Sequence, residues 1–344
     1  MKPSPLLNTK FTPPPGAGYL PRPHLIRWLG SHTEQRLILI SAPPGYGKTT
    51  LLADFYRARS EPSAWYQLEA SDSDPTVFLS HLIESIRRSK TINKKSAKIG
   101  QNAQSLLNNA ESGMDSRRVL TVLINELSEQ ITDSLLIILE DYHFVASPIV
   151  HQLVDYLLEN IPATIHVILS TRVDPPLSLA RLRARGLLSE LRASDLRFRD
   201  DEVASFLRQE SPDLSSDSLS VLSQKTEGWA AALQIVRSSL AGQDAESARE
   251  IVTSLSGSHR FVFEYLAEEV FRRQSEARQR FLLRTSVLTQ MDSSSCNAVA
   301  EIQNAQDMLE ELERGNLFIT SLDGKQRWYQ YHFLFREFLL SKRK

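Results

Sequence analysis

The sequence predicts an α/β domain built on a parallel sheet, followed by a helical domain and a smaller domain of helices and one hairpin. In the first half of the chain, short apolar runs alternate with helix-length amphipathic segments, which is typical of parallel strands covered on both faces. After about residue 195 such runs nearly vanish and helical periodicity takes over. The length of 344 residues allows two or three domains, at roughly 150 residues each.

The first elements follow from prolines and apolar runs. Residues 1–23 contain seven prolines, which remove backbone donors and fix φ, so we expect an extended N-terminal arm without a helix. Residues 24–195 form the predicted α/β domain. Its strands are expected at four buried runs, which are 36–41, 64–68, 135–139 and 165–169. Helical patterns between these runs include 77–86 and 150–157.

The later elements are mostly helical. Residues 89–113 are polar, and we expect a solvated insertion or, alternatively, a basic contact formed by Lys90, Lys94, Lys95 and Lys98. Residues 196–256 predict a helical domain. Residues 257–344 predict three helices, a hairpin with a turn at Asp323 and Gly324, and a final helix. This order suggests a winged-helix domain.

The composition excludes several classes of protein. Lys plus Arg total 40 against 41 Asp plus Glu, so no overall positive field draws the chain to nucleic acid, and we expect no direct binding of it. The single cysteine, Cys296, rules out an intramolecular disulfide framework and a zinc site built on several thiolates. No apolar run approaches the roughly 18 residues needed to span a bilayer. We therefore expect a cytoplasmic protein without a membrane partner.

The strand that ends at Ser41 leads into a glycine-rich loop and then an amphipathic helix. The pattern G-x-x-x-x-G-K-[ST] fits at Gly47, Lys48 and Thr49, with Ala42 in place of its first glycine. Such a loop turns backbone amides toward phosphates, Lys48 reaches the β and γ oxygens, and the Thr49 hydroxyl ligates Mg²⁺. The sequence thus predicts a P-loop NTPase that binds ATP or ADP with Mg²⁺ through Pro44, Gly45, Tyr46, Gly47, Lys48, Thr49 and Thr50.

Two further strands end in charged residues. Glu140 and Asp141 follow the run 135–139, at the carboxyl edge of the sheet where phosphates lie. We expect one of them to hold Mg²⁺ and the other to position water, and the order Glu before Asp leaves the assignment open and suggests slow hydrolysis. Arg172 follows the run 165–169 and either senses a γ-phosphate or is an ordinary solvated arginine. The predicted catalytic group is Lys48, Glu140, Asp141 and Arg172.

Several motifs together resemble one family. They are PRPHL (21–25), PPGYGKTT (43–50), DYH (141–143), STR (170–172), EGWAAALQ (227–234), FLLRTS (281–286) and YHFLF (331–335). The chain resembles the N-terminal ATPase module of the large LuxR-type ATP-dependent transcriptional regulators, within the STAND class of signalling NTPases.

The resemblance implies a regulatory switch. The nucleotide-binding, helical and winged-helix domains would close around ADP, and ATP with an inducer would open them and permit self-association. Leu20 and Arg22 would border the adenine, and His332 would either reach the phosphates or simply pack, while Trp229 is expected in the core. Members of the family continue into sensor and DNA-binding domains, so we expect these in a longer parent protein.

Two other functions stay open at this point. One alternative is a P-loop ATPase with ordinary turnover in metabolism or remodelling. The other is a winged helix that binds DNA by itself, for which Lys325, Arg327 and Arg336 offer the basic residues.

Overall fold

The computed structural model describes residues 7–16, 20–89, 99–108, 115–243, 252, 260–323 and 325–343. They form two units, described separately below. The first comprises Met1–Ser41 and Lys48–Arg192, and the second comprises Ala42–Gly47 and Ala193–Lys344. The glycine-rich loop therefore groups with the second unit, although it joins two elements of the first. Among the described residues, no helix combines the length and apolar character needed to cross a bilayer.

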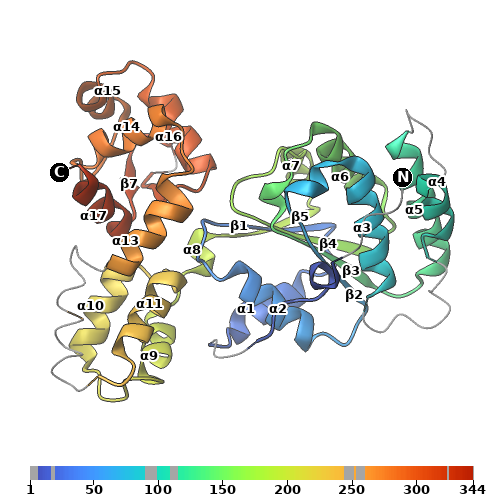
Figure 1. Cartoon of the computed structure of the whole chain (residues 1–344), viewed down its shortest axis with the longest axis horizontal. Coiled ribbons are helices and arrows are strands. Elements are labelled where there is room, and N and C mark those ends of the chain that lie inside the picture. Colours follow the sequence, from blue (N-terminus) through green and yellow to red (C-terminus); the bar gives the residue numbers. More distant parts are fainter. Residues whose placement is uncertain are drawn as a thin grey trace. The chain divides into compact units, whose positions relative to one another are not determined.

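The first unit contains a five-stranded parallel sheet of order β2-β3-β4-β1-β5 (Figure 1). Its strands are β1 (Leu37–Ser41), β2 (Ser63–Gln67), β3 (Leu135–Glu140), β4 (Ile165–Thr171) and β5 (Leu188–Arg192). The predicted α/β fold class is confirmed, and the strands β1 to β4 lie at the four predicted runs. Because all strands are parallel, their carboxyl ends meet at one edge of the sheet.

Helices cover both faces of this sheet (Figure 1). Alternate strand residues, such as Leu37 and Leu39, join the main apolar core with residues of α3 (Pro75–Arg87), α5 (Ser116–Gln130) and α6 (Pro148–Asn160). On the other face lie α1 (Pro23–Ser31) and α2 (Lys48–Ala58), where Tyr56 contacts Trp65 of β2 edge to face. Because both faces of the sheet are covered, successive residues of a strand are buried on opposite faces, and the strand sequences are therefore nearly continuous apolar runs.

Two segments of the first unit differ from expectation. Within the predicted extended arm, Asn8–Phe11 form a turn of 3-10 helix (η1) whose Lys10 and Phe11 are buried. Within the predicted insertion, α4 (Gln101–Asn108) buries Ala103 and Leu107 in the core, so this part is packed rather than solvated. The four lysines proposed for a basic contact lie outside the described residues.

Apart from the loop Ala42–Gly47, the second unit starts with a short helix, α8 (Ala193–Leu196), and three longer ones. These are α9 (Asp200–Arg208), α10 (Ser216–Thr226) and α11 (Ala230–Leu240). The described chain continues with α13 (Arg260–Leu266) and a π-helical turn, η5 (Ala267–Phe271). The predicted boundary at 256/257 falls among residues outside the described part.

The final segment has the predicted winged-helix order. It contains α14 (Glu276–Thr285), α15 (Ser293–Ala300), α16 (Ala305–Arg314), the antiparallel strands β6 (Ile319–Ser321) and β7 (Tyr329–Tyr331), and α17 (Phe333–Lys342). A bridge from Met291 to Tyr329 extends the hairpin. Gly324 of the predicted turn lies outside the described residues. The fold predicted for this part of the chain is confirmed.

Candidate functional site

The loop between β1 and α2 has the backbone that its glycines predict. Gly45 and Gly47 have φ values of 79° and 77°, in the left-handed region that favours glycine. Ala42, which replaces the first glycine of the motif, is fully buried. Helix α2 begins at Lys48, directly after the loop, and the N-terminal end of a helix favours an anion.

Thr49 and Glu140 meet at the carboxyl edge of the sheet. The Thr49 hydroxyl, on the first turn of α2, donates a hydrogen bond to Oε1 of Glu140 at the end of β3. Glu140 is 0% exposed, and within the described residues its Oε2 accepts no hydrogen bond. Burial, and then the charge of Asp141, raise the pKa of Glu140. A buried carboxylate oxygen left without a partner beside a hydroxyl fits the oxygen ligands that Mg²⁺ prefers.

Phosphate oxygens and water would have to supply the remaining ligands of such an ion. In the described part of the chain, no group of three or more His, Cys, Asp or Glu residues is placed to hold a metal. Mg²⁺ commonly binds through one or two protein ligands together with substrate phosphates. The donor set therefore fits a nucleotide-bound Mg²⁺ better than a resident metal centre.

Lys48 lies among charges of both signs in the first unit. It is 6% exposed, and burial together with the charge of Arg172 lowers its pKa despite the opposing pull of Glu140 and Asp141. Asp141 has a left-handed φ of 60°, and burial raises its pKa against the charges of Lys48 and Arg172. The structure thus brings the predicted catalytic group to one edge of the sheet. An anion near Lys48 would offset the cost of its burial.

For three other residues predicted to bind the nucleotide, the structure gives the burial of the side chain. Arg22 is buried directly before α1, and Leu20 is half-buried two residues earlier. Thr50, in the first turn of α2, is also half-buried. Their roles stay predictions.

In the second unit, the glycine-rich loop contacts the start of α11. The indole N–H of Trp229 donates to the carbonyl oxygen of Pro44 at 3.1 Å, and the amide of Ala231 donates to that of Gly45 at 2.9 Å. A Cβ on Gly45 would come within 2.6 Å of Ala231 Cβ, so only glycine permits this approach. The first-turn amides of a helix lack partners in their own helix, which leaves Ala231 free to bind the loop.

Trp229 is a core residue, as expected, and also a loop contact, which the sequence did not reveal. It is 0% exposed, with its ring 4.9 Å from Phe318 and 5.8 Å from His332 between centroids. Tyr46 is likewise buried in this unit, 6.0 Å from Phe318, and burial raises its pKa to about 12. The signal for Trp229 was its place in EGWAAALQ, where an indole directly precedes the first residue of a helix.

His332 is held by hydrogen bonds on both ring nitrogens. Its Nδ1 accepts from the amide of Leu334 at 3.3 Å and caps α17, so its Nε2 donates to the carbonyl of Thr226 at 3.0 Å. Burial lowers its pKa to about 4, so the ring is neutral at pH 7. These contacts agree with the alternative in which His332 only packs inside the second unit. A phosphate contact would require one of these bonds to break, and it stays a prediction.

The Glu-Gly segment before Trp229 joins three parts of the second unit. Glu227, at a left-handed φ of 47°, accepts a hydrogen bond from the amide of Phe333 at 2.7 Å and pairs with Arg197 at 3.2 Å. A Cβ on Gly228 would lie 2.3 Å from the carbonyl oxygen of Phe198, so this position also requires glycine. Glu227 is therefore bonded to the start of α17, the helix that follows the hairpin, and lies two residues before Trp229, which contacts the loop.

Comparisons with known proteins agree with this organisation. Residues 267–344 match the family described as MalT winged helix domain. The HTH-type transcriptional regulator MalT of Serratia proteamaculans is 34% identical over 326 residues, covering 92% of this chain and 34% of the relative. The serine/threonine-protein kinase PknK of Mycobacterium tuberculosis is 32% identical over 337 residues, covering 96% and 29%. The chain thus spans about a third of the length of these relatives.

A solved structure shows the same fold. The Walker-type ATPase PABY2304 of Pyrococcus abyssi superposes with a TM-score of 0.58 at 15% identity, covering 92% of this chain and 95% of that one. At this identity the likeness concerns the fold alone. Together with the winged-helix match, the sequence relatives confirm the predicted resemblance of this chain to the LuxR-type regulators of which MalT is an example.

Proposed function

We propose that this chain binds an adenine nucleotide with Mg²⁺ and acts as the nucleotide-dependent regulatory part of a longer protein. The left-handed glycines of the loop, the buried Lys48 and the contact between Thr49 and Glu140 support nucleotide binding. The match to the MalT winged helix domain supports a regulatory role rather than a metabolic one.

Each residue of the site has a distinct role in this proposal. Lys48 neutralises the β and γ oxygens, and Arg172 responds to the γ-phosphate. Of the two acidic residues, Glu140 is favoured as the Mg²⁺ ligand because it already contacts Thr49, the other expected ligand. Asp141 then positions the attacking water. When bound, Mg²⁺ would supply charge neutralisation between phosphate oxygens.

The regulatory part of this proposal is supported by two hydrogen bonds, from Trp229 and Ala231 to the carbonyls of the loop. A γ-phosphate that changes the loop backbone must also change these bonds. We propose that ADP favours a closed form, and that ATP with an inducer opens it and permits self-association. Reversing a two-state equilibrium from 1:99 to 99:1 takes about 5.5 kcal/mol, a size that several charged contacts to one phosphate can supply.

Lys48→Ala tests the nucleotide site. We expect it to abolish ATP and ADP binding in calorimetric titrations, while circular dichroism confirms that the variant remains folded. Unchanged affinity in a folded variant would reject the assignment of the loop.

Turnover tests the regulatory role against the enzyme alternative. We expect ADP to be released when the purified chain is denatured, together with very slow steady-state hydrolysis. Turnover on the order of 10 per second, an ordinary value for an enzyme, would favour an ATPase with metabolic or remodelling work.

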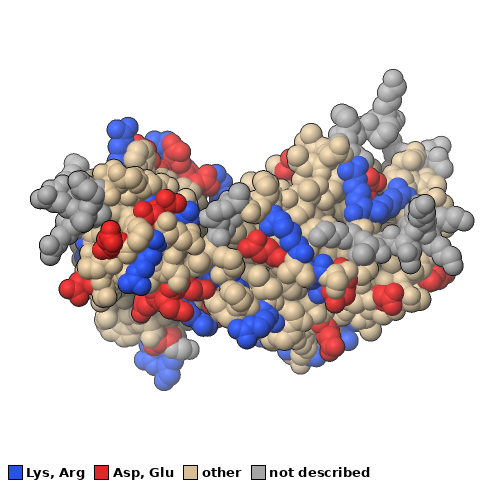
Figure 2. Space-filling view, turned by 90° about the horizontal axis from the view of Figure 1, so that it is seen from below, with Lys and Arg blue, Asp and Glu red and all other residues tan. Residues whose placement is uncertain are grey.

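The DNA-binding alternative depends on three basic residues of the winged helix. Arg336 donates to the carbonyls of Leu288 and Val287, at 3.2 and 3.3 Å, and so holds the domain together. Lys325 and Arg327 are exposed. On the face that Figure 2 shows, basic and acidic side chains are interspersed. A titration with duplex DNA at low salt tests direct binding, for which we expect no saturable signal.

A further inference from the structure

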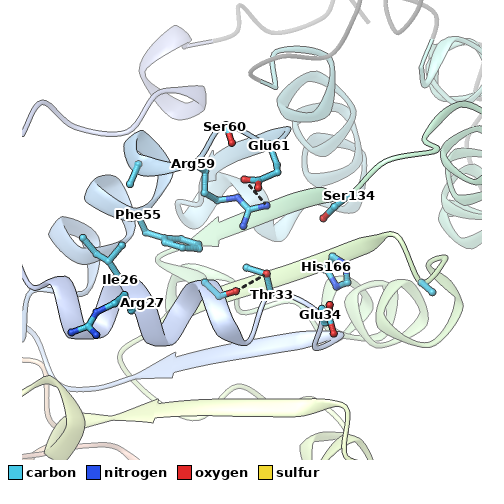
Figure 3. A pocket seen from close by; sticks show the side chains of 13 residues that line it. Ile26, Arg27, Thr33, Glu34, Phe55, Arg59, Ser60, Glu61, Ser134 and His166 are labelled. Atoms are coloured by element: carbon cyan, nitrogen blue, oxygen red, sulfur yellow. Dashed lines mark hydrogen bonds and ion pairs between the residues drawn. The ribbon is translucent and has the colours of Figure 1, made fainter.

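The first unit has a hollow of about 760 Å³ at the edge of the sheet where the strands begin (Figure 3). It is lined by residues that precede or start four neighbouring strands, among them Thr33, Ser60, Ser134 and His166. Helices α1 and α2 contribute Ile26 and Phe55 to its wall. The phosphate-binding edge lies at the opposite, carboxyl ends of the same strands.

Arg59 is the central polar group of this hollow. It follows the last residue of α2, and its guanidinium is directed into the hollow (Figure 3). The side chain is only 9% exposed, and within the described residues its Nε–H has no hydrogen-bond acceptor. Its charged partner, Glu61, is 3.6 Å away and is itself largely exposed. The Nε–H is covered by the protein, so a ligand in the hollow would reach Arg59 through its Nη groups, whose present charge partner lies 3.6 Å away.

The surrounding groups restrict the charge of that acceptor. Glu34 and Glu61 place two carboxylates at the rim, against the guanidinium groups of Arg27 and Arg59. His166 donates through Nδ1 to the carbonyl of Gln35 at 3.1 Å, and burial lowers its pKa, so it adds no charge at pH 7. The lining is therefore balanced. Each further negative charge on a ligand would be repelled by Glu34 and Glu61 without a free partner of its own, so this lining favours a monoanion over a dianion.

The wall beside Arg59 is apolar. Phe55 is buried, and the Arg59 guanidinium carbon lies 5.5 Å from the centre of its ring. Ile26 lines the same hollow from α1. A ligand that places an anionic group on Arg59 would therefore bring its carbon skeleton against Phe55 and Ile26.

We propose that this hollow binds a small organic carboxylate, whose two oxygens pair with the Nη groups of Arg59. The planar guanidinium presents two parallel donors that match a carboxylate. The site is distinct from the phosphate loop, because Lys48 and Arg59 stand at opposite ends of α2, whose 11 residues span about 16 Å. The proposal does not depend on the function proposed above.

Benzoate is a suitable probe, because it joins one carboxylate to a ring that can lie on Phe55. Titrations of the full chain are followed by ligand-observed NMR. We expect saturable binding of benzoate to the wild-type chain and to Lys48→Ala, and no binding of the neutral analogue benzamide. Arg59→Lys keeps the charge at the end of α2 but removes the paired donors. It should weaken benzoate about tenfold or more, the size of one charged hydrogen bond.

Arg118→Lys is the matched control, because Arg118 is exposed on α5, away from the hollow. It should leave benzoate binding unchanged, and thermal unfolding of both variants should stay near that of the wild type. The proposal is overturned if benzoate does not bind the wild-type chain, if Arg59→Lys leaves its affinity unchanged, or if benzamide binds equally well. Tighter binding of phenylphosphonate than of benzoate would reject the carboxylate class.

Discussion

Glu140 and Asp141 are adjacent in sequence but differ in their surroundings. Glu140 ends β3 fully buried and accepts a hydrogen bond from Thr49, whereas Asp141 leaves the strand at a left-handed φ and lies 3.7 Å from Nδ1 of His143. The longer side chain therefore reaches the first turn of α2, and the shorter one does not share this contact. This difference is the reason why we propose different roles for the two residues.

Glu140→Gln should uncouple nucleotide binding from Mg²⁺. The variant keeps the shape of the side chain but loses the charge that holds the ion, so we expect the gain in ADP affinity from Mg²⁺ to fall about tenfold or more. Calorimetric titrations with Mg²⁺ and with EDTA measure this ratio. Asp141→Asn should keep the ratio and slow hydrolysis. The reverse pattern in the two variants would assign Mg²⁺ to Asp141.

Two buried tryptophans allow a test of the loop contact. The indole N–H of Trp229 binds Pro44, whereas that of Trp65 is buried with no acceptor among the described residues. Trp229→Phe leaves the carbonyl of the half-buried Pro44 without this donor, at a cost of about 0.5–1.5 kcal/mol, and we expect faster release of ADP. Stopped-flow displacement of a fluorescent ADP measures this rate.

Trp65→Phe is the matched control for this variant, since it removes the same ring atoms without a hydrogen bond. It should change ADP release little. An equal acceleration in both variants would mean that packing, and not the bond to Pro44, holds the loop.

At the scale of elements, the sequence predicted those whose signal is local. The strands β1 to β4 are buried almost throughout and rich in apolar residues, because both sheet faces are covered. The edge strand β5 escaped prediction, because its Glu190 pairs with Arg183 and Arg192 and the strand is mostly half-buried. Likewise no local pattern marks η1, whose Lys10 finds its partner Asp72 at a separation of 62 residues.

The Lys10 contact belongs to a buried network that anchors the arm to the first unit. Asp72, in the turn η2 (Ala70–Ser73), is fully buried and accepts hydrogen bonds from Lys10 at 2.7 Å, Tyr66 at 2.8 Å and the amide of Glu69 at 2.7 Å. Nδ1 of His81 lies 2.7 Å from the same carboxylate. Burial alone would raise the pKa of Asp72, but these hydrogen bonds outweigh it and lower the pKa.

Asp72→Asn should destabilise the first unit by about 2 kcal/mol at pH 7, because it leaves the buried Lys10 with only the exposed carboxylate of Glu69, 2.9 Å away, as a charge partner. The folded pKa of Asp72 lies below the ordinary 3.8, so its stabilisation is complete above that value and is lost as the pH falls through the folded pKa. Urea unfolding of wild type and variant, followed by circular dichroism, should therefore differ at pH 7 and converge in acid. A difference that persists unchanged in acid would contradict this account.

For the whole molecule, the contrast between local signals and contacts distant in sequence also separates the parts of the site that the sequence predicted from those that it did not. Lys48, Thr49 and Glu140 stand next to strand ends in a known order, so their meeting at one sheet edge follows from a parallel sheet. The bond between Trp229 and Pro44 joins residues 185 apart and needs the tertiary fold. The glycine-rich loop therefore belongs, by its contacts, to the second unit.

The amide of Ala231 offers a direct test of whether nucleotide state controls this loop contact. Its hydrogen bond to the carbonyl of Gly45 protects it from exchange only while the loop and α11 stay together. We expect strong protection with ADP, and faster exchange with a non-hydrolysable ATP analogue. The amide of Leu233, bonded at 3.0 Å to the carbonyl of Trp229 within its own helix, should stay protected in both states. Light scattering on the same samples reports self-association. Equal protection of Ala231 with both nucleotides would show that the loop and α11 move as one body, and the proposed opening would then have to occur elsewhere.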